Sequence, residues 1–153
     1  MTEIKQAALV LQDGTLFEGE LIGYEPELGY ASGEVVFNTA LTGYQEVITD
    51  PSYAGQIITF TYPHIGNYGI NAEDFESDKP YCRGIIIKDL ARRYSNWRSD
   101  TSLNTFLTRS KVSGICGVDT RRLTRHIREA GAMPGAFGTA DEKTLHAAAQ
   151  KEP

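Results

Sequence analysis

The sequence is poor in the residues that mark secreted, metal-binding and membrane proteins. Among 153 residues it has only three histidines and two cysteines, Cys82 and Cys116, with no Cys-x-x-Cys motif. So few cysteines predict reduced thiols and a cytoplasmic protein. The longest apolar stretches, such as 7–11, are far too short to cross a bilayer. The N-terminus also lacks the basic and apolar segments of a secretion signal.

The remaining composition is that of an ordinary folded domain. Hydrophobic residues make up 41% and charged residues 23%, which is typical of a globular chain and not of a disordered one. A chain of this length can bury one real core. The Pro- and Gly-containing stretch 62–82 has no repeat or low-complexity character, so we interpret it as one loop. We therefore expect a single domain over residues 1–153.

Charge is distributed unevenly along the chain. The net charge is −5, but residues 1–82 carry −11, residues 83–128 carry +8 and residues 129–153 carry −2. Such asymmetry can mark a surface that binds a partner or an anion. The alternative is a solvated surface on which the charges intermix after folding. We favour this second interpretation, because the basic residues are spread over several expected elements.

Short apolar and β-branched segments predict six strands, at 7–12, 16–22, 33–39, 56–61, 84–87 and 115–118. Asp13-Gly14 between the first two predicts a tight hairpin, since both central positions can take positive φ. The later strands are continuous apolar runs that alternate with helical segments, which implies a right-handed parallel crossover. Hairpins followed by crossovers predict a mixed α/β domain with an antiparallel layer and a partly parallel layer.

Capping residues delimit the expected helices. Asp119 is a good N-cap for a helix over 120–130, and Gly131 would end it. The Ala-rich segment 141–150 predicts a last helix, which we expect to fray at the terminus. Two further helices are expected: one that contains Leu103, Phe106 and Leu107 with Asp100 as its cap, and a short one that starts at the capping box Thr42 to Gln45 and ends before Pro51.

Motifs for self-sufficient catalysis are absent from the sequence. Neither cysteine lies in a sharp Gly-x-Cys-x-Gly turn, so we interpret both as structural. No pair of histidines has the spacing of a zinc site, and Gly66-Asn67-Tyr68-Gly69 lacks the lysine and the spacing of a phosphate-binding loop. His64 could contact another domain, but a hydrogen bond that fixes its own loop is the interpretation we favour. We expect no catalytic residue, metal or cofactor in this chain.

Four arginines, Arg121, Arg122, Arg125 and Arg128, crowd the expected helix over 120–130. Like charges four residues apart destabilise an isolated helix, so something should offset them. The candidates are the acidic stretch 73–78, a partner protein or a nucleic acid. A carboxylate from this chain or from a partner is favoured, because the pI near 5.2 and the lack of a recognised binding module speak against nucleic acid.

The segment Asp50-Pro51-Ser52-Tyr53 is a turn signature, in which proline presets φ. The Ser52 hydroxyl can donate and accept hydrogen bonds within one compact group. From this chemistry alone, Ser52 is interpreted as a residue that stabilises the turn.

Three segments together resemble one family, the small chain of carbamoyl-phosphate synthetase. They run from Gly33-Glu34-Val35-Val36-Phe37-Asn38-Thr39 through Thr42-Gly43-Tyr44-Gln45-Glu46, from Thr49-Asp50-Pro51-Ser52-Tyr53 to Thr61-Tyr62-Pro63-His64-Ile65-Gly66-Asn67, and from Asp119-Thr120-Arg121-Arg122-Leu123-Thr124-Arg125 to Glu129-Ala130-Gly131. The opening Asp13-Gly14-Thr15 matches as well. The resemblance covers nearly the whole chain in order. Only the loop 24–30 and the segment 92–98 depart from the usual pattern.

The resemblance implies a fold and a position within a larger protein. It implies a three-layer β/β/α domain of the swivelling type, with mixed antiparallel and parallel sheets. This would be the N-terminal domain of the small subunit. The family's second domain, a class I glutamine amidotransferase with a Cys-His-Glu triad, is absent from this chain, so we expect the sequence to be a fragment.

The resemblance also implies a role in glutamine-dependent synthesis. Glutamine is hydrolysed on the small subunit, and ammonia passes to the large subunit, which uses bicarbonate, ATP and Mg to make carbamoyl phosphate for the arginine and pyrimidine pathways. The expected partners are the amidotransferase domain, the large subunit and glutamine, with no nucleic acid or membrane. The family pattern assigns Ser52 to the glutamine-binding site. Alternatives are a free-standing interaction module with the same fold and a small cysteine enzyme.

Overall fold

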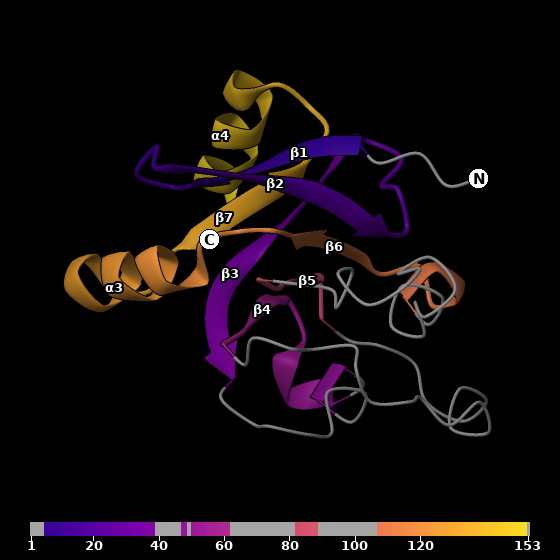
Figure 1. Ribbon diagram of the computed structural model, residues 1–153, viewed down its shortest axis with the longest axis horizontal. Helices are drawn as coiled ribbons and strands as arrows, with labels where there is room; N and C mark the ends of the chain where they lie inside the picture. Colours follow the sequence, from indigo (N-terminus) through magenta and orange to yellow (C-terminus); the bar gives the residue numbers. More distant parts are fainter. Residues whose placement is uncertain (1–4, 39–46, 49, 62–81, 89–106, 153) are drawn as a thin grey trace.

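A computed structural model of the chain describes residues 5–38, 47–48, 50–61, 82–88 and 107–152. Within these residues, seven strands form a closed barrel in the order β1-β2-β6-β5-β4-β3-β7 (Figure 1). The strands are β1 (Lys5–Leu11), β2 (Leu16–Gly23), β3 (Tyr30–Asn38), β4 (Gln56–Phe60), β5 (Gly84–Ile86), β6 (Ser113–Cys116) and β7 (Pro134–Gly138). The helical elements described from end to end are η1 (Pro51–Tyr53), α3 (Thr120–Ala130) and α4 (Glu142–Lys151), and residues 107–109 are helical as well.

The barrel combines parallel and antiparallel pairing. The four strands β3, β4, β5 and β6 are parallel neighbours, whereas β1, β2 and β7 pair antiparallel with the strands beside them. The expected α/β class with mixed pairing is therefore confirmed. The three-layer β/β/α arrangement is not confirmed, because the described strands share one closed barrel.

Three buried clusters lie inside the barrel and on its outer faces. The inner face of every strand contributes to one cluster, with Leu9, Ile57 and Phe137 among its members, and Leu123 and Ile127 of α3 join it. The outer face of β1 and β7 is covered by α4 through Leu145, Ala148 and Ala149 (Figure 1). On the outer face of β4, β5 and β6, a third cluster includes Ile48 and Leu107. Leu123 and Ile127 attach α3 to the barrel at the end where β3, β4 and β5 finish.

The hairpin between β1 and β2 differs from the expected two-residue turn. The Leu11 N–H donates to the Thr15 carbonyl, so three residues form the loop. Only Gly14 has positive φ, at 91°, and its N–H donates to the Leu11 carbonyl. This is the three-residue loop in which a left-handed glycine follows a tight turn.

Strand β7 was not predicted from the sequence. Its sequence, PGAFG, contains no β-branched residue and resembles a loop. Pairing with both β1 and β3 imposes the strand, and the small residues let these backbones approach. A Cβ on Gly138 would clash with the Gly29 carbonyl oxygen, so a larger residue does not fit there.

The helix predictions have different outcomes. The helix over 120–130 is confirmed as α3, capped by the Asp119 side chain on the Arg122 N–H and ended at Gly131 with φ of 98°. The last helix is confirmed as α4, but it packs on the barrel, where the neighbouring Ser32 hydroxyl donates to Glu152 at 2.7 Å. The predicted capping box at Thr42, most of the helix through Leu103 and the loop over 62–82, except Cys82, lie outside the described residues. In the described part of the chain, no helix has the length and apolar character needed to span a bilayer.

Candidate functional site

Both cysteines are buried, as expected for structural thiols. Cys116 is on β6, and Cys82 lies just before β5. Burial raises the pKa of the Cys82 thiol to about 11, so this thiol is protonated at neutral pH and is a poor nucleophile.

Ser52 is exposed at the surface, in the short helical turn η1 that leads into β4. Its N–H donates to Asp50 Oδ1 at 2.9 Å. Hydrogen bonds from the backbone and the hydroxyl of Ser52 hold the pKa of Asp50 below its ordinary value. Next to it, the Tyr53 hydroxyl accepts from Asn38 Nδ2 at 2.9 Å, which ties the turn to β3. The turn-stabilising interpretation of Ser52 agrees with these contacts, and its predicted role toward glutamine stays a prediction.

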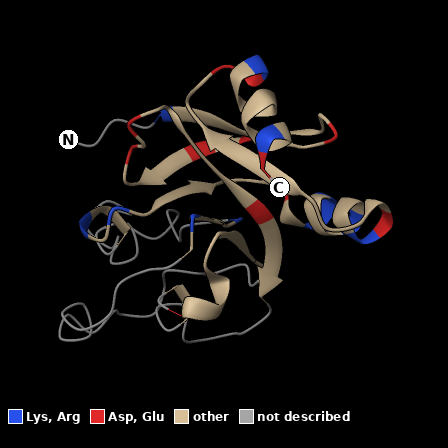
Figure 2. Ribbon diagram, turned by 180° about the vertical axis from the view of Figure 1, so that it is seen from behind, with Lys and Arg blue, Asp and Glu red and all other residues tan. Residues whose placement is uncertain are grey.

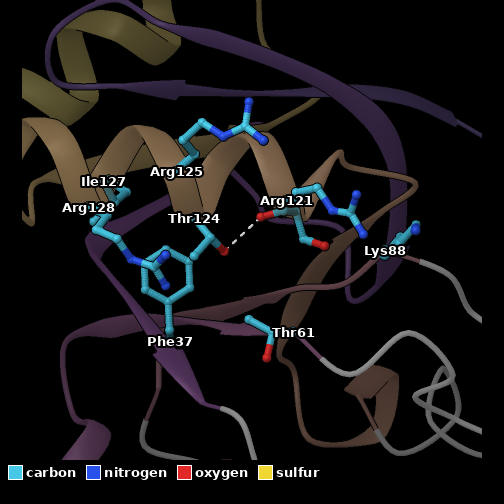
Figure 3. Close-up of a pocket in the computed structure, with 9 residues that line it drawn as sticks. Phe37, Thr61, Lys88, Arg121, Thr124, Arg125, Ile127 and Arg128 are labelled. Carbon is cyan, nitrogen blue, oxygen red and sulfur yellow. Dashed lines mark hydrogen bonds between the residues drawn. The ribbon is translucent and has the colours of Figure 1, made fainter.

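A groove of about 700 Å³ lies between α3 and the carboxyl ends of three parallel strands. Phe37 is near the end of β3, Thr61 follows β4, and Lys88 follows β5 (Figure 3). The other side is formed by α3, which contributes Thr120, Arg121, Thr124, Arg125, Ile127 and Arg128. We call this feature the basic groove. The carboxyl edge of parallel strands is a common position for binding sites in α/β proteins.

Four cations line the basic groove, namely Lys88, Arg121, Arg125 and Arg128, and all four are exposed. No acidic side chain lines it among the described residues, and within that part of the chain none of the four cations forms an ion pair. Basic residues recur along α3 (Figure 2). The acidic stretch 73–78, a candidate partner for these arginines, lies outside the described residues, so the expected intermixing of charges stays a prediction. Within the described residues, cations from two elements gather around one groove.

Arg122, the one arginine of α3 that does not line the groove, lies apart from it. Its guanidinium stands over the Phe17 ring at 4.0 Å and donates to the Leu16 carbonyl at 2.9 Å. These contacts attach α3 to β2 within the chain. The arginines of α3 therefore separate into one that contacts β2 and three that line the groove.

Local backbone features position the groove residues. The Asp119 side chain accepts from the Arg122 N–H at 3.1 Å, which sets the first turn of α3. Just before it, Gly117 has φ of 81°, and its N–H donates to the Lys88 carbonyl at 3.0 Å. This bond joins the segment after β6 to the segment after β5. Lys88 is thereby held close to the start of α3.

Two histidines hold the tip of the β1–β2 hairpin. His126 Nε2 on α3 lies 2.7 Å from Asp13 Oδ2 and 3.2 Å from the Thr15 hydroxyl. On α4, His146 Nε2 lies 3.0 Å from the Gln12 carbonyl. Within the described residues, no group of three or more His, Cys, Asp or Glu side chains could hold a metal ion. His64 lies outside the described residues.

Sequence reasoning identified the arginines of the groove but missed its opposite wall. Phe37, Thr61 and Lys88 carry no motif, and they come from segments far apart in the chain. The usable signal was that each stands at or near the end of a predicted strand. Had those strands been assigned as parallel neighbours, their ends would have been placed at one edge.

Comparisons with known proteins agree on one family. The family profile described as "Carbamoyl-phosphate synthase small chain, CPSase domain" matches residues 9–137. The pyrimidine-specific small chain of carbamoyl phosphate synthase from Bacillus subtilis (strain 168) is 55% identical over 134 residues, which cover 88% of this chain and 36% of that protein.

Two other small chains match to a similar degree. The carbamoyl phosphate synthase small chain of Polynucleobacter asymbioticus is 58% identical over 131 residues, covering 86% of this chain and 32% of the relative. That of Neisseria meningitidis serogroup A is 55% identical over 142 residues, covering 93% and 37%. The chain thus spans about a third of the length of the curated relatives it matches.

Proposed function

Because this chain belongs to the carbamoyl-phosphate synthase small-chain family, we propose that it is a scaffold domain that performs no catalysis by itself. It supports glutamine hydrolysis by a neighbouring amidotransferase domain and the delivery of ammonia to a large synthetase subunit. That subunit makes carbamoyl phosphate from bicarbonate with ATP and Mg, for the arginine and pyrimidine pathways. The working compartment is the cytoplasm.

The observation that carries this proposal is the burial of the two thiols, together with the kind of polar side chain that is exposed. Both thiols are buried, and the one whose pKa is raised, Cys82, is protonated at neutral pH. The exposed polar features in the described part of the chain include Ser52 on its proline-preset turn and the basic groove. A lone hydroxyl needs a neighbouring base before it can act as a nucleophile. A cationic surface can bind and orient a charged partner.

We propose that Ser52 completes the glutamine site of the neighbouring domain. Its N–H and hydroxyl are aligned by Asp50, so the group has a fixed direction. A prepositioned hydroxyl costs little entropy when a ligand binds it. One such group cannot hold glutamine alone, which is why the proposal requires the second domain.

The three-layer description of the fold is also kept as a proposal. Two opposite walls of a flattened barrel would supply two β layers, and α4 on the outside of β1 and β7 would supply the helical layer. The packing of α4 on these strands supports this view.

The test of the scaffold role uses the purified chain in two assays. Glutamine turnover by the chain alone is expected to stay at background. Binding to the large synthetase subunit of the same organism, measured by analytical ultracentrifugation, is expected to be specific. Turnover that disappears in Cys82→Ala or Cys116→Ala would contradict the proposal, because it would make the chain a cysteine enzyme.

A free-standing interaction module is the second candidate, and the basic groove is the observation that favours it. Such a module would leave the large subunit unbound and would bind an unrelated protein in a salt-dependent manner. The binding assay above separates the two candidates.

A further inference from the structure

We propose that the basic groove binds an extended, carboxylate-rich segment of the large synthetase subunit. The inference rests on the proposed function for the identity of the partner. The groove, its charges and its dimensions are features of this chain alone.

The length of the charged wall favours a peptide over a single small anion. Arg121, Arg125 and Arg128 lie at positions i, i+4 and i+7 of α3. At 1.5 Å per residue they extend over about 10 Å of helix, and Lys88 adds a fourth charge from the strand side. One phosphate carries at most two negative charges, fewer than the four cations of the groove. An extended segment places alternate side chains about 7 Å apart on one face and can supply one carboxylate for each of several cations.

The charge of the groove favours carboxylates. Guanidinium groups bind carboxylates through paired hydrogen bonds, and such bonds are stronger than neutral ones. Arg121 with Arg125, and Arg125 with Arg128, are like-charge pairs that disfavour the helix. The Arg122 guanidinium contacts the Phe17 ring and donates a hydrogen bond to the Leu16 carbonyl. The groove arginines, in contrast, have no carboxylate beside them among the described residues. A bound acidic segment would remove this repulsion.

The groove also contains apolar surface. Phe37 and Ile127 line it together with the cations (Figure 3), and Phe37 is half-buried. A free inorganic anion gains nothing from an aromatic ring and an isoleucine. The side chains between the carboxylates of a peptide would bury this surface.

The location of the groove fits a domain that contacts two neighbours. Ser52 lies in η1, just before β4, and Thr61 follows the carboxyl end of β4. The two proposed sites are thus separated by the length of this strand, about 17 Å for five residues. One end of β4 would face the amidotransferase domain and the other end would face the large subunit.

The experiment uses the complete small chain and the complete large subunit. The test variant is Arg121→Gln/Arg125→Gln/Arg128→Gln, and the matched control is Lys143→Gln/Lys151→Gln on α4, away from the groove. Glutamine has nearly the helix propensity of arginine, so the test variant is expected to keep its thermal midpoint. Affinity is measured by surface plasmon resonance at several salt concentrations. We expect the test variant to bind at least about tenfold more weakly, with a smaller salt dependence, and the control to bind as the parent chain does.

Each other outcome has a distinct meaning. If the parent chain binds the large subunit and the folded test variant binds equally well, the groove proposal is overturned while the proposed function stands. If the parent chain does not bind at all, the proposed function itself fails. In a separate arm, millimolar inorganic phosphate is titrated against the parent chain. The proposal would be overturned if phosphate binds saturably, if this binding needs the three arginines, and if bound phosphate leaves the affinity for the large subunit unchanged. The groove would then be a small-anion site.

Discussion

At the scale of single residues, the hairpin tip is held by polar contacts that depend on pH. Asp13 accepts hydrogen bonds from the Thr15 N–H at 3.1 Å and the Thr15 hydroxyl at 2.8 Å, and it contacts His126. Partial burial raises the pKa of Asp13, but the Thr15 hydrogen bonds and His126 together outweigh it, so the pKa lies below its ordinary value. The ionised carboxylate therefore stabilises the folded state.

The replacement Asp13→Asn tests this contribution. A lowered pKa stabilises the fold above the ordinary aspartate value of about 3.9, and the effect is lost as the pH falls through the lowered pKa. We expect the variant to lose up to about 1 kcal/mol at pH 7, since the contact is partly exposed. The loss should shrink toward zero as the pH falls through the lowered pKa of Asp13.

Thermal unfolding across pH measures this difference. Glu129→Gln, which removes an exposed carboxylate at the far end of α3, is the control. A difference between Asp13→Asn and the parent that is constant with pH would show that ionisation of Asp13 does not stabilise the fold.

Thr59 is the one buried side chain in the described residues whose polar atom has no hydrogen-bond partner. It lies on β4, between Phe37 of β3 and Ile86 of β5. A buried hydroxyl without a partner carries an uncompensated desolvation cost. We expect Thr59→Val to stabilise the chain by about 1 kcal/mol in urea unfolding.

Thr15→Val is the matched control for this change, because the Thr15 hydroxyl is hydrogen-bonded. It should destabilise the chain. If Thr59→Val also destabilises it, the Thr59 hydroxyl has a partner that the structure does not show.

At the scale of elements, the sequence predicts best where signals are local. Helix α3 has the predicted bounds because a side-chain cap, an apolar face and a left-handed glycine all lie within the same thirteen residues. Strand β7 was missed because its partners, β1 and β3, determine it. Its low strand propensity is overridden by pairing on both sides, and no local pattern reveals such pairing.

The Phe137 ring on β7 lies so close to Gly84 on β5 that only glycine fits at position 84. A Cβ on Gly84 of β5 would lie 2.5 Å from Phe137 Cζ and 3.0 Å from the Ser113 carbonyl oxygen. We expect Gly84→Ala to destabilise the chain by about 1–3 kcal/mol in urea unfolding, because a close-packed core cannot absorb the added methyl group.

Phe137→Leu provides the second half of a double-mutant cycle. If the clash with the ring is the cause, the double variant should lose less than the sum of the two single losses. Additive losses would place the cause elsewhere, in the contact with the β6 backbone.

At the scale of the whole molecule, the family could be identified from the sequence, but the barrel and the groove could not. Resemblance rests on motifs spread along the chain, which need no tertiary information. The closure of seven strands into a barrel depends on pairing between segments far apart in the sequence. The position of Lys88 in the same groove as the arginines of α3 depends on this pairing too. Ser52 was placed on a turn by its proline, and the structure confirms the turn and its exposure.

The account of the whole molecule assigns Ser52 a role that exists only in the assembled enzyme. The most direct measurement is steady-state synthesis of carbamoyl phosphate by the complete small chain and large subunit, with glutamine or ammonia as the nitrogen source. Ser52→Ala is compared with Ser32→Ala, a serine that bonds Glu152 beside α4. The account predicts a KM for glutamine raised about 3- to 10-fold by Ser52→Ala, as expected for one lost hydrogen bond, with ammonia-dependent synthesis unchanged. An unaltered KM for glutamine in Ser52→Ala would contradict it.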